Sequence, residues 1–126
     1  MTAVPEAFVP SSNLVVLRGD VVADPVQRLL PSGGVVIQFD LRTELSEGTP
    51  RRVSVPIAWS DPSAAALRPV VAGAEMLVVG SVIRRFFRVG GATQSRTEVV
   101  PEVVVPARRG ARVRAALTAA AERLAC

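Results

Sequence analysis

Period-two alternation is clearest in residues 35–43, which read VVIQFDLRT. The apolar side chains that face one way are Val35, Ile37, Phe39 and Leu41. The polar side chains that face the other way are Gln38, Asp40 and Arg42. This alternation is typical of a strand with one buried face. Turn-forming residues bound it, with PSGG at 31–34 before it and Gly48 and Pro50 after it.

Further strands are expected on both sides of this one, at residues 13–22, 27–30, 52–59, 75–88 and 95–100. Gly19 and Gly80 lie inside two of them and indicate a bulge or a bend. Pro56 favours an edge position or a bulge for residues 52–59. A short helix is expected to begin at Asp61-Pro62 and to end near Arg68. A longer helix is expected over residues 111–124, where apolar residues recur at helical spacing.

This order of elements predicts an all-β fold. The chain has 126 residues, about one domain, which is too small for a two-sheet sandwich with this many short strands. A five-stranded barrel with a short helix between the later strands is the oligonucleotide-binding (OB) architecture. We therefore expect an irregular segment at residues 1–12, an OB-fold domain at 13–105, and a basic linker with an Ala-rich C-terminal helix at 106–126.

The composition excludes several classes of protein. With 49% hydrophobic residues, the chain is too apolar to be disordered. It contains no His or Tyr, which removes imidazole catalysis and His-based metal sites. Its one Cys, Cys126, cannot form an intrachain disulfide, and the acidic residues form no evident metal cluster. We expect no enzyme activity, no cofactor, no metal and no small-molecule substrate.

The apolar runs are short. None approaches the ~20 residues that a membrane helix needs, and residues 1–8 lack the pattern of a signal peptide. We therefore expect no membrane partner and a cytoplasmic location. The abundance of Ala, Val, Gly, Pro and Arg is consistent with GC-rich codons, which suggests a bacterial source.

The distribution of charge is uneven. All fifteen basic residues are Arg. Residues 1–83 carry six Arg and eight acidic residues, whereas residues 84–114 carry eight Arg and two acidic residues. A basic segment on a near-neutral body suggests a polyanionic partner, most often nucleic acid.

The first strand and the turn after it carry a specific motif. Residues 13–34 have the form N-x-V-x-L-x-G-x-x-x-x-D-P-x-x-R-x-x-P-x-G-G without a gap. They resemble the opening of bacterial single-stranded DNA-binding proteins. Weaker similarities follow at Leu67, Gly73, Val78, Gly80, the basic-aromatic run 84–87 and the strand at 95–100, so the resemblance covers residues 13–105.

The resemblance implies an OB-fold protein that binds single-stranded DNA in replication, repair and recombination. It also implies a nucleoid-associated homo-oligomer, a dimer or tetramer joined through the first strand. Three features depart from the family: an aromatic residue is missing near Glu44, another is replaced by Val53, and the Gly/Pro-rich tail with its acidic tip is absent. The chain therefore resembles a divergent paralogue.

Residues 84–88, RRFFR, are the strongest candidate for binding. Arg neutralises phosphates, and exposed aromatic rings stack on bases. Because neighbouring side chains alternate on a strand, one of the two rings should point outward. The resemblance places Phe87 outside beside Arg85, with Phe86 inward; the alternative is that both rings fill the end of the barrel.

The other candidates are less clustered. The resemblance makes Trp59 a stacking residue, whereas its periodicity with Val55 and Ile57 indicates the core. Arg18 and Arg28 flank the groove of the resembling fold, and Arg42 is a weaker candidate. The complete predicted nucleic-acid site is Arg18, Arg28, Arg51, Arg52, Trp59, Arg84, Arg85, Phe87, Arg88 and Arg96.

Four Arg precede or enter the last helix: Arg108, Arg109, Arg112 and Arg114. They could extend the basic track, the helix could pack on a neighbouring subunit, or it could face solvent, partly frayed. Two alternatives to single-stranded DNA binding stay open from the sequence: an OB-fold module that docks a protein, and a protein that binds single-stranded RNA.

Overall fold

The computed structural model describes residues 11–125. Most of the irregular segment predicted at 1–12, and Cys126, lie outside these residues. Six strands and two helices follow in the order β1 (Val15–Val21), β2 (Val26–Leu29), β3 (Val35–Leu45), β4 (Arg51–Ser60), α1 (Ala64–Leu67), β5 (Glu75–Val89), β6 (Ala92–Pro106) and α2 (Gly110–Ala125). Neither helix is long and apolar enough to cross a membrane in this part of the chain.

The strands close into a barrel. The sheet order is β1-β5-β6-β4-β3-β2, and β1 also pairs with β3 through Asp20–Arg42 and Val21–Leu41. This second pairing joins β1, β5, β6, β4 and β3 into a ring of five strands, with β2 attached outside it on β3. The predicted five-stranded OB-fold barrel, with a short helix before the last two strands and a helix at the C-terminus, is confirmed.

Gly19 allows the ring to close. A Cβ atom at this position would collide with the main-chain carbonyl of Arg42 on β3. Only a residue without a side chain permits this close approach of two backbones. Gly80 permits a similar close approach between β5 and β6, because a Cβ there would meet the carbonyl of Val100, and the β5–β6 register shifts between Val79 and Gly80.

The core fills the barrel with the inward-facing side chains that the alternation predicted. Ile37, Phe39 and Leu41 of β3 are buried there. The remaining buried members of this cluster are Val21, Ile57, Trp59, Val70, Met76, Val78, Val99 and Val104. The outward-facing Asp40 and Arg42 are exposed.

β4 is an inner strand, so the edge position suggested by Pro56 is wrong. It pairs with β3 over its whole length, but its pairing with β6 is confined to Ile57 and Val99. The β6 side of β4 therefore carries almost no ladder of hydrogen bonds. A proline can be accommodated in such a strand without breaking one.

The start of α1 also differs from the prediction. Ser63, not Asp61, caps the helix, because its hydroxyl accepts a hydrogen bond from the Ala66 N–H at 3.1 Å. Asp61 has a positive φ of 45°, and its carboxylate accepts a hydrogen bond from the Val35 N–H at 2.9 Å. The acidic residue thus closes the gap between the ends of β3 and β4 instead of starting the helix.

α2 packs on the outside of its own barrel. Ala120 is buried against Leu77 and Val79 of β5, with Val113 and Ala116 beside it. Arg123 also donates a hydrogen bond to Glu102 of β6 at 2.6 Å. The solvent-facing helix considered from the sequence is wrong for this face, which the barrel itself covers. Leu117 and Leu124, predicted on the same apolar side, are exposed.

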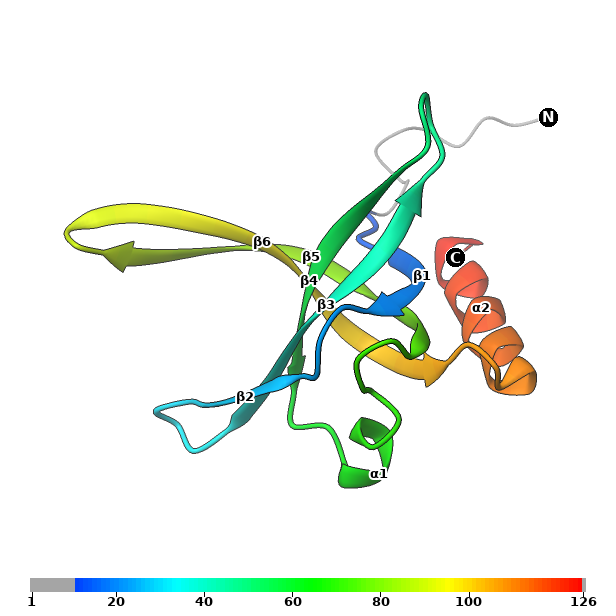
Figure 1. The fold of residues 1–126 in the computed structure, drawn as a ribbon, viewed down its shortest axis with the longest axis horizontal. Coiled ribbons are helices and arrows are strands. Elements are labelled where there is room, and N and C mark those ends of the chain that lie inside the picture. The colour runs from blue at the N-terminus through cyan, green and yellow to red at the C-terminus, as the bar shows by residue number, and fades with distance from the viewer. Residues whose placement is uncertain (1–10, 126) are drawn as a thin grey trace.

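The β3–β4 and β5–β6 hairpins project from the barrel in different directions (Figure 1). The β3–β4 hairpin is the shorter one. The β5–β6 hairpin is formed by two strands of 15 residues each, paired from Met76–Pro106 to Val89–Ala92. The last strand is therefore much longer than the predicted 95–100, since the ladder continues far beyond the barrel wall.

Candidate nucleic-acid interface

The β5–β6 hairpin carries five of the ten predicted binding residues, distributed over two faces. Direct cross-strand partners share a face of a sheet. Arg85 pairs with Arg96, and Phe87 pairs with Gln94, which places these four side chains on one face. The other face holds Arg84, Phe86 and Arg88 with their partners Thr97, Ser95 and Thr93.

Both aromatic rings of the hairpin are exposed. Phe86 is 64% exposed and Phe87 is 39% exposed. The inward position that the resemblance implied for Phe86 is therefore wrong, as is the alternative that both rings fill the barrel end. The physical reason is the length of the hairpin: beyond the barrel wall, neither face of this two-stranded ribbon has a core to pack against.

Arg84 adds a cation–π contact on the Phe86 face. Its Cζ atom lies 5.4 Å from the centre of the Phe86 ring, and its guanidinium donates a hydrogen bond to the Ser95 hydroxyl at 3.0 Å. These contacts hold the guanidinium beside an exposed ring. A base that stacks on Phe86 would thus have a positive charge close to its phosphate.

Glu98 lies at the base of the hairpin on the Phe87 side. Its carboxylate is 3% exposed and accepts a hydrogen bond from Arg85 Nε at 2.7 Å. Arg96 Nε lies 3.7 Å from the other carboxylate oxygen. Glu98 lies in the stretch 95–100 that resembles a strand of the family, but nothing in the pattern of that stretch indicated that the side chain is buried between two Arg.

Arg28 and Arg96 line one pocket, although they are far apart in the sequence. This Arg28–Arg96 pocket is lined by β2, β3 and the connection between β1 and β2, with Arg96 contributed by β6, and its other lining residues are Val22, Ala23, Asp24, Val26, Gln38, Phe39 and Asp40. Arg96 also belongs to the hairpin. The pocket therefore adjoins the hairpin surface, with Asp24 and Asp40 in its lining beside the two Arg.

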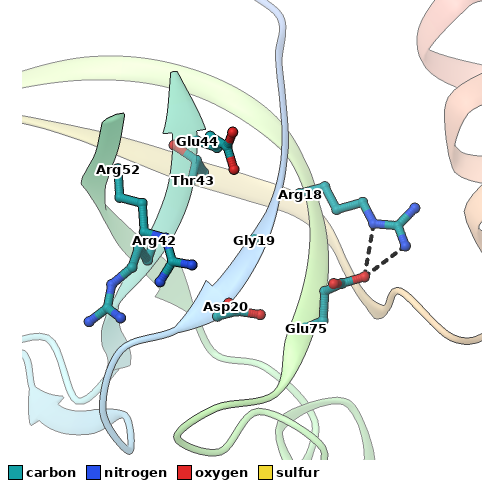
Figure 2. Close-up of a pocket in the computed structure, with 8 residues that line it drawn as sticks. All are labelled: Arg18, Gly19, Asp20, Arg42, Thr43, Glu44, Arg52 and Glu75. Carbon is teal, nitrogen blue, oxygen red and sulfur yellow. Dashed lines mark hydrogen bonds and ion pairs between the residues drawn. The ribbon is translucent and has the colours of Figure 1, made fainter. Parts of the chain in front are cut away.

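Arg18 and Arg52 line a second pocket, together with Arg42 (Figure 2). Three acidic residues share this Arg18–Arg52 pocket: Asp20, Glu44 and Glu75. Arg18 turns away from Arg42 and donates two hydrogen bonds to Glu75, at 2.9 and 2.7 Å. Positive and negative side chains balance here, so the pocket attracts a polyanion less than the hairpin does.

The structure separates the remaining predicted residues from these groups. Arg51 begins β4 opposite Leu45, near the tip of the β3–β4 hairpin, and faces away from its neighbour Arg52. Trp59 is 9% exposed and packs in the barrel core. Of the two positions left open for Trp59, the core is the correct one, and its assignment as a stacking residue is withdrawn.

Sequence reasoning did not include three residues of the candidate interface in the predicted site. Phe86 was expected to be buried, Gln38 was not considered, and Glu98 was seen only as part of a family motif. The alternation of residues 35–43 did place Gln38 on the outward face, which was a usable signal. No signal of a metal centre is present: residues 11–125 contain no group of three or more His, Cys, Asp or Glu side chains that could hold an ion.

Comparison with known proteins gives similarity in structure only. No protein-family model matches the sequence, and no curated protein sequence matches it. Among solved structures, the chain is similar to a Plasmodium falciparum SSB in complex with ssDNA, with a TM-score of 0.62 and 23% sequence identity. The match covers 73% of this chain and 88% of that chain. This likeness supports the OB-fold assignment made above from the topology.

Proposed function

We propose that the protein binds single-stranded DNA, largely independently of sequence and without catalysing a reaction. One observation carries the proposal: residues 84–97 combine four Arg with no acidic residue, and the two Phe among them are exposed. Guanidinium groups bind the phosphates that all nucleotides share, and aromatic rings stack on any base. Neither contact distinguishes one base from another, which accounts for binding without sequence preference.

The surface also offers a path for a strand. Arg96 joins the hairpin to the Arg28–Arg96 pocket, so a strand held on the Phe87 face could continue across β3 toward Arg28. Single strands need several such contacts in a row because each contact is weak. The similar Plasmodium falciparum SSB was solved with ssDNA, which supports the proposal at the level of the fold.

A fluorescently labelled oligo-dT titrated with the full chain at several salt concentrations tests the proposal. Four or five phosphate contacts predict a slope of about −2.8 to −3.5 for log affinity against log salt, at ~0.7 per contact. An oligo-rU of the same length, run in parallel, compares RNA with DNA. Absence of binding at low salt, or an affinity that salt does not change, would contradict the proposal.

A second candidate function is docking of a protein partner. Leu117 and Leu124 of α2 favour it, because they are exposed although α2 packs on the barrel. A partner that co-purifies with the chain, together with no shift of the oligonucleotide, would favour this candidate. Homo-oligomer formation, a cytoplasmic, nucleoid-associated location and a role in replication, repair and recombination stay predictions.

A further inference from the structure

Glu98 is the one charged side chain that is buried among residues 11–125. A carboxylate taken out of water is strongly destabilising unless charged partners and hydrogen bonds compensate it. Arg85 and Arg96 supply this compensation through their Nε atoms, at 2.7 and 3.7 Å. The carboxylate therefore links two Arg that the β5–β6 ladder places directly opposite each other.

The two Arg remain open to solvent on their other side. Their side chains are 58% and 47% exposed. Within the described part of the chain, Arg85 makes no side-chain hydrogen bond besides the one to Glu98, and Arg96 makes none. A guanidinium has five N–H donors, so an Nε–H directed at Glu98 leaves the others available. Without a shared carboxylate, two like charges opposite each other on a ladder would repel and turn apart.

We infer that Glu98 is a positioning residue, which holds Arg85 and Arg96 together so that both guanidinium groups can bind one phosphate beside Phe87. This inference rests on the proposed function. Phe87 follows Arg85 by two residues on the same face of the hairpin and is partly exposed. One nucleotide could thus place its phosphate on the Arg pair and its base on the ring.

The inference predicts that removing the negative charge of Glu98 weakens DNA binding. A carboxylate near a phosphate repels it, so a purely electrostatic surface should bind DNA more tightly once Glu98 is neutralised. A positioning role predicts the reverse, because two long side chains must then be ordered at the moment of binding. The direction of the change in affinity therefore separates the two explanations.

The test is Glu98→Gln, which keeps the size of the side chain and removes its charge. We expect it to weaken oligo-dT binding about 3- to 10-fold, the cost of ordering one or two flexible side chains on binding. Glu102→Gln is the matched control, since it removes the same charge from the same strand, at a carboxylate that is exposed and paired with Arg123 on α2. Its affinity should stay within about twofold of the original protein.

A double-mutant cycle separates positioning from general stability. Arg85→Ala should weaken binding clearly in the original protein, but by less than half of that factor in the Glu98→Gln background, because the Arg is no longer held there. Thermal unfolding of each variant verifies that it is folded. If Glu98→Gln does not fold, Glu98→Asp, which withdraws the carboxylate by one methylene but keeps its charge, should show the same loss of affinity.

Different outcomes contradict the proposed function and the positioning role of Glu98. If the original protein does not bind oligo-dT, the proposed function and this inference both fall. If the original protein binds and Glu98→Gln binds equally well or more tightly, only the positioning role of Glu98 is overturned. Equal losses for Arg85→Ala in both backgrounds would also overturn it.

Discussion

The β3–β4 and β5–β6 hairpins, which project in different directions (Figure 1), carry similar numbers of Arg but have different surfaces. Residues 42–52 around the β3–β4 tip contain three Arg and two Glu and no aromatic residue. Residues 84–97 of the β5–β6 hairpin contain four Arg, no acidic residue and two exposed Phe. An Arg count is therefore not enough to propose an interface for nucleic acid. What distinguishes the β5–β6 hairpin is that Arg84 and Arg88, which form no ion pair within residues 11–125, lie beside exposed rings.

The largest expected effect comes from the rings. The double variant Phe86→Ala/Phe87→Ala should weaken oligo-dT binding by about 30-fold or more, because each stacked ring contributes ~1–3 kcal/mol. Fluorescence anisotropy with a labelled oligonucleotide measures this loss. Leu45→Ala, an exposed apolar residue on the other hairpin, is the control and should leave the affinity unchanged. Equal effects of the two variants would remove the rings from the site.

Charge should have the next largest effect, and it should differ between the hairpins. Arg84→Gln/Arg88→Gln should weaken binding about 10-fold at moderate salt and reduce the salt slope by about 1.4, at ~0.7 per lost phosphate contact. Arg51→Gln/Arg52→Gln removes the same charge from the β3–β4 hairpin and should change the slope by less than half as much. Equal slopes for the two variants would show that the contrast between the hairpins has no role in binding.

The aromatic residue inside the barrel should affect stability and not binding. Trp59→Phe should lower the free energy of unfolding by about 1–2 kcal/mol, because it leaves a small space in the core. Its affinity for oligo-dT should stay within about twofold. Denaturant unfolding and anisotropy measure the two quantities. Strong quenching of Trp59 fluorescence by DNA would contradict the core position.

The smallest effect is expected at Arg18. Its partner Glu75 and its own side chain are both about half exposed, and such surface pairs contribute roughly 0–1 kcal/mol to stability. Arg18→Gln should therefore leave both the unfolding midpoint and the affinity almost unchanged. A loss of affinity as large as that of the Arg84/Arg88 variant would bring the Arg18–Arg52 pocket into the interface.

The sequence predicted the barrel because its information is local and periodic. Alternation in residues 35–43 assigned the buried face of β3 correctly, and Gly19 and Gly80 indicated where the strands approach or shift. The length of β5 was predicted to within one residue, but that of β6, and with it the extent of the paired ribbon, was not, because pairing partners are set by the whole ladder. That length decides the exposure of Phe86, which is why its predicted position was wrong.

The residue types of the candidate site could be predicted from the sequence, but their placement in space could not. The run 84–88 was recognised from its charge and its rings, but the shared pocket of Arg28 and Arg96 depends on the tertiary arrangement of the closed barrel. The burial of Glu98 has the same origin. Its strand pattern is equally compatible with an exposed carboxylate, and only the tertiary packing of the β5–β6 base places it out of water.

The attachment of β2 outside the five-stranded ring has a consequence for self-association. In the part of the chain described, β2 pairs with β3 alone, so its other side presents unpaired backbone groups, the usual starting point for sheet growth between molecules. That side is only four residues long, lies between Pro25 and Pro31, and carries Arg28. An incoming strand would find too few partners for a lasting ladder, and copies that did align would bring two guanidinium groups together. We therefore expect Arg28, which lies on the proposed DNA path, also to disfavour strand pairing between copies at this edge.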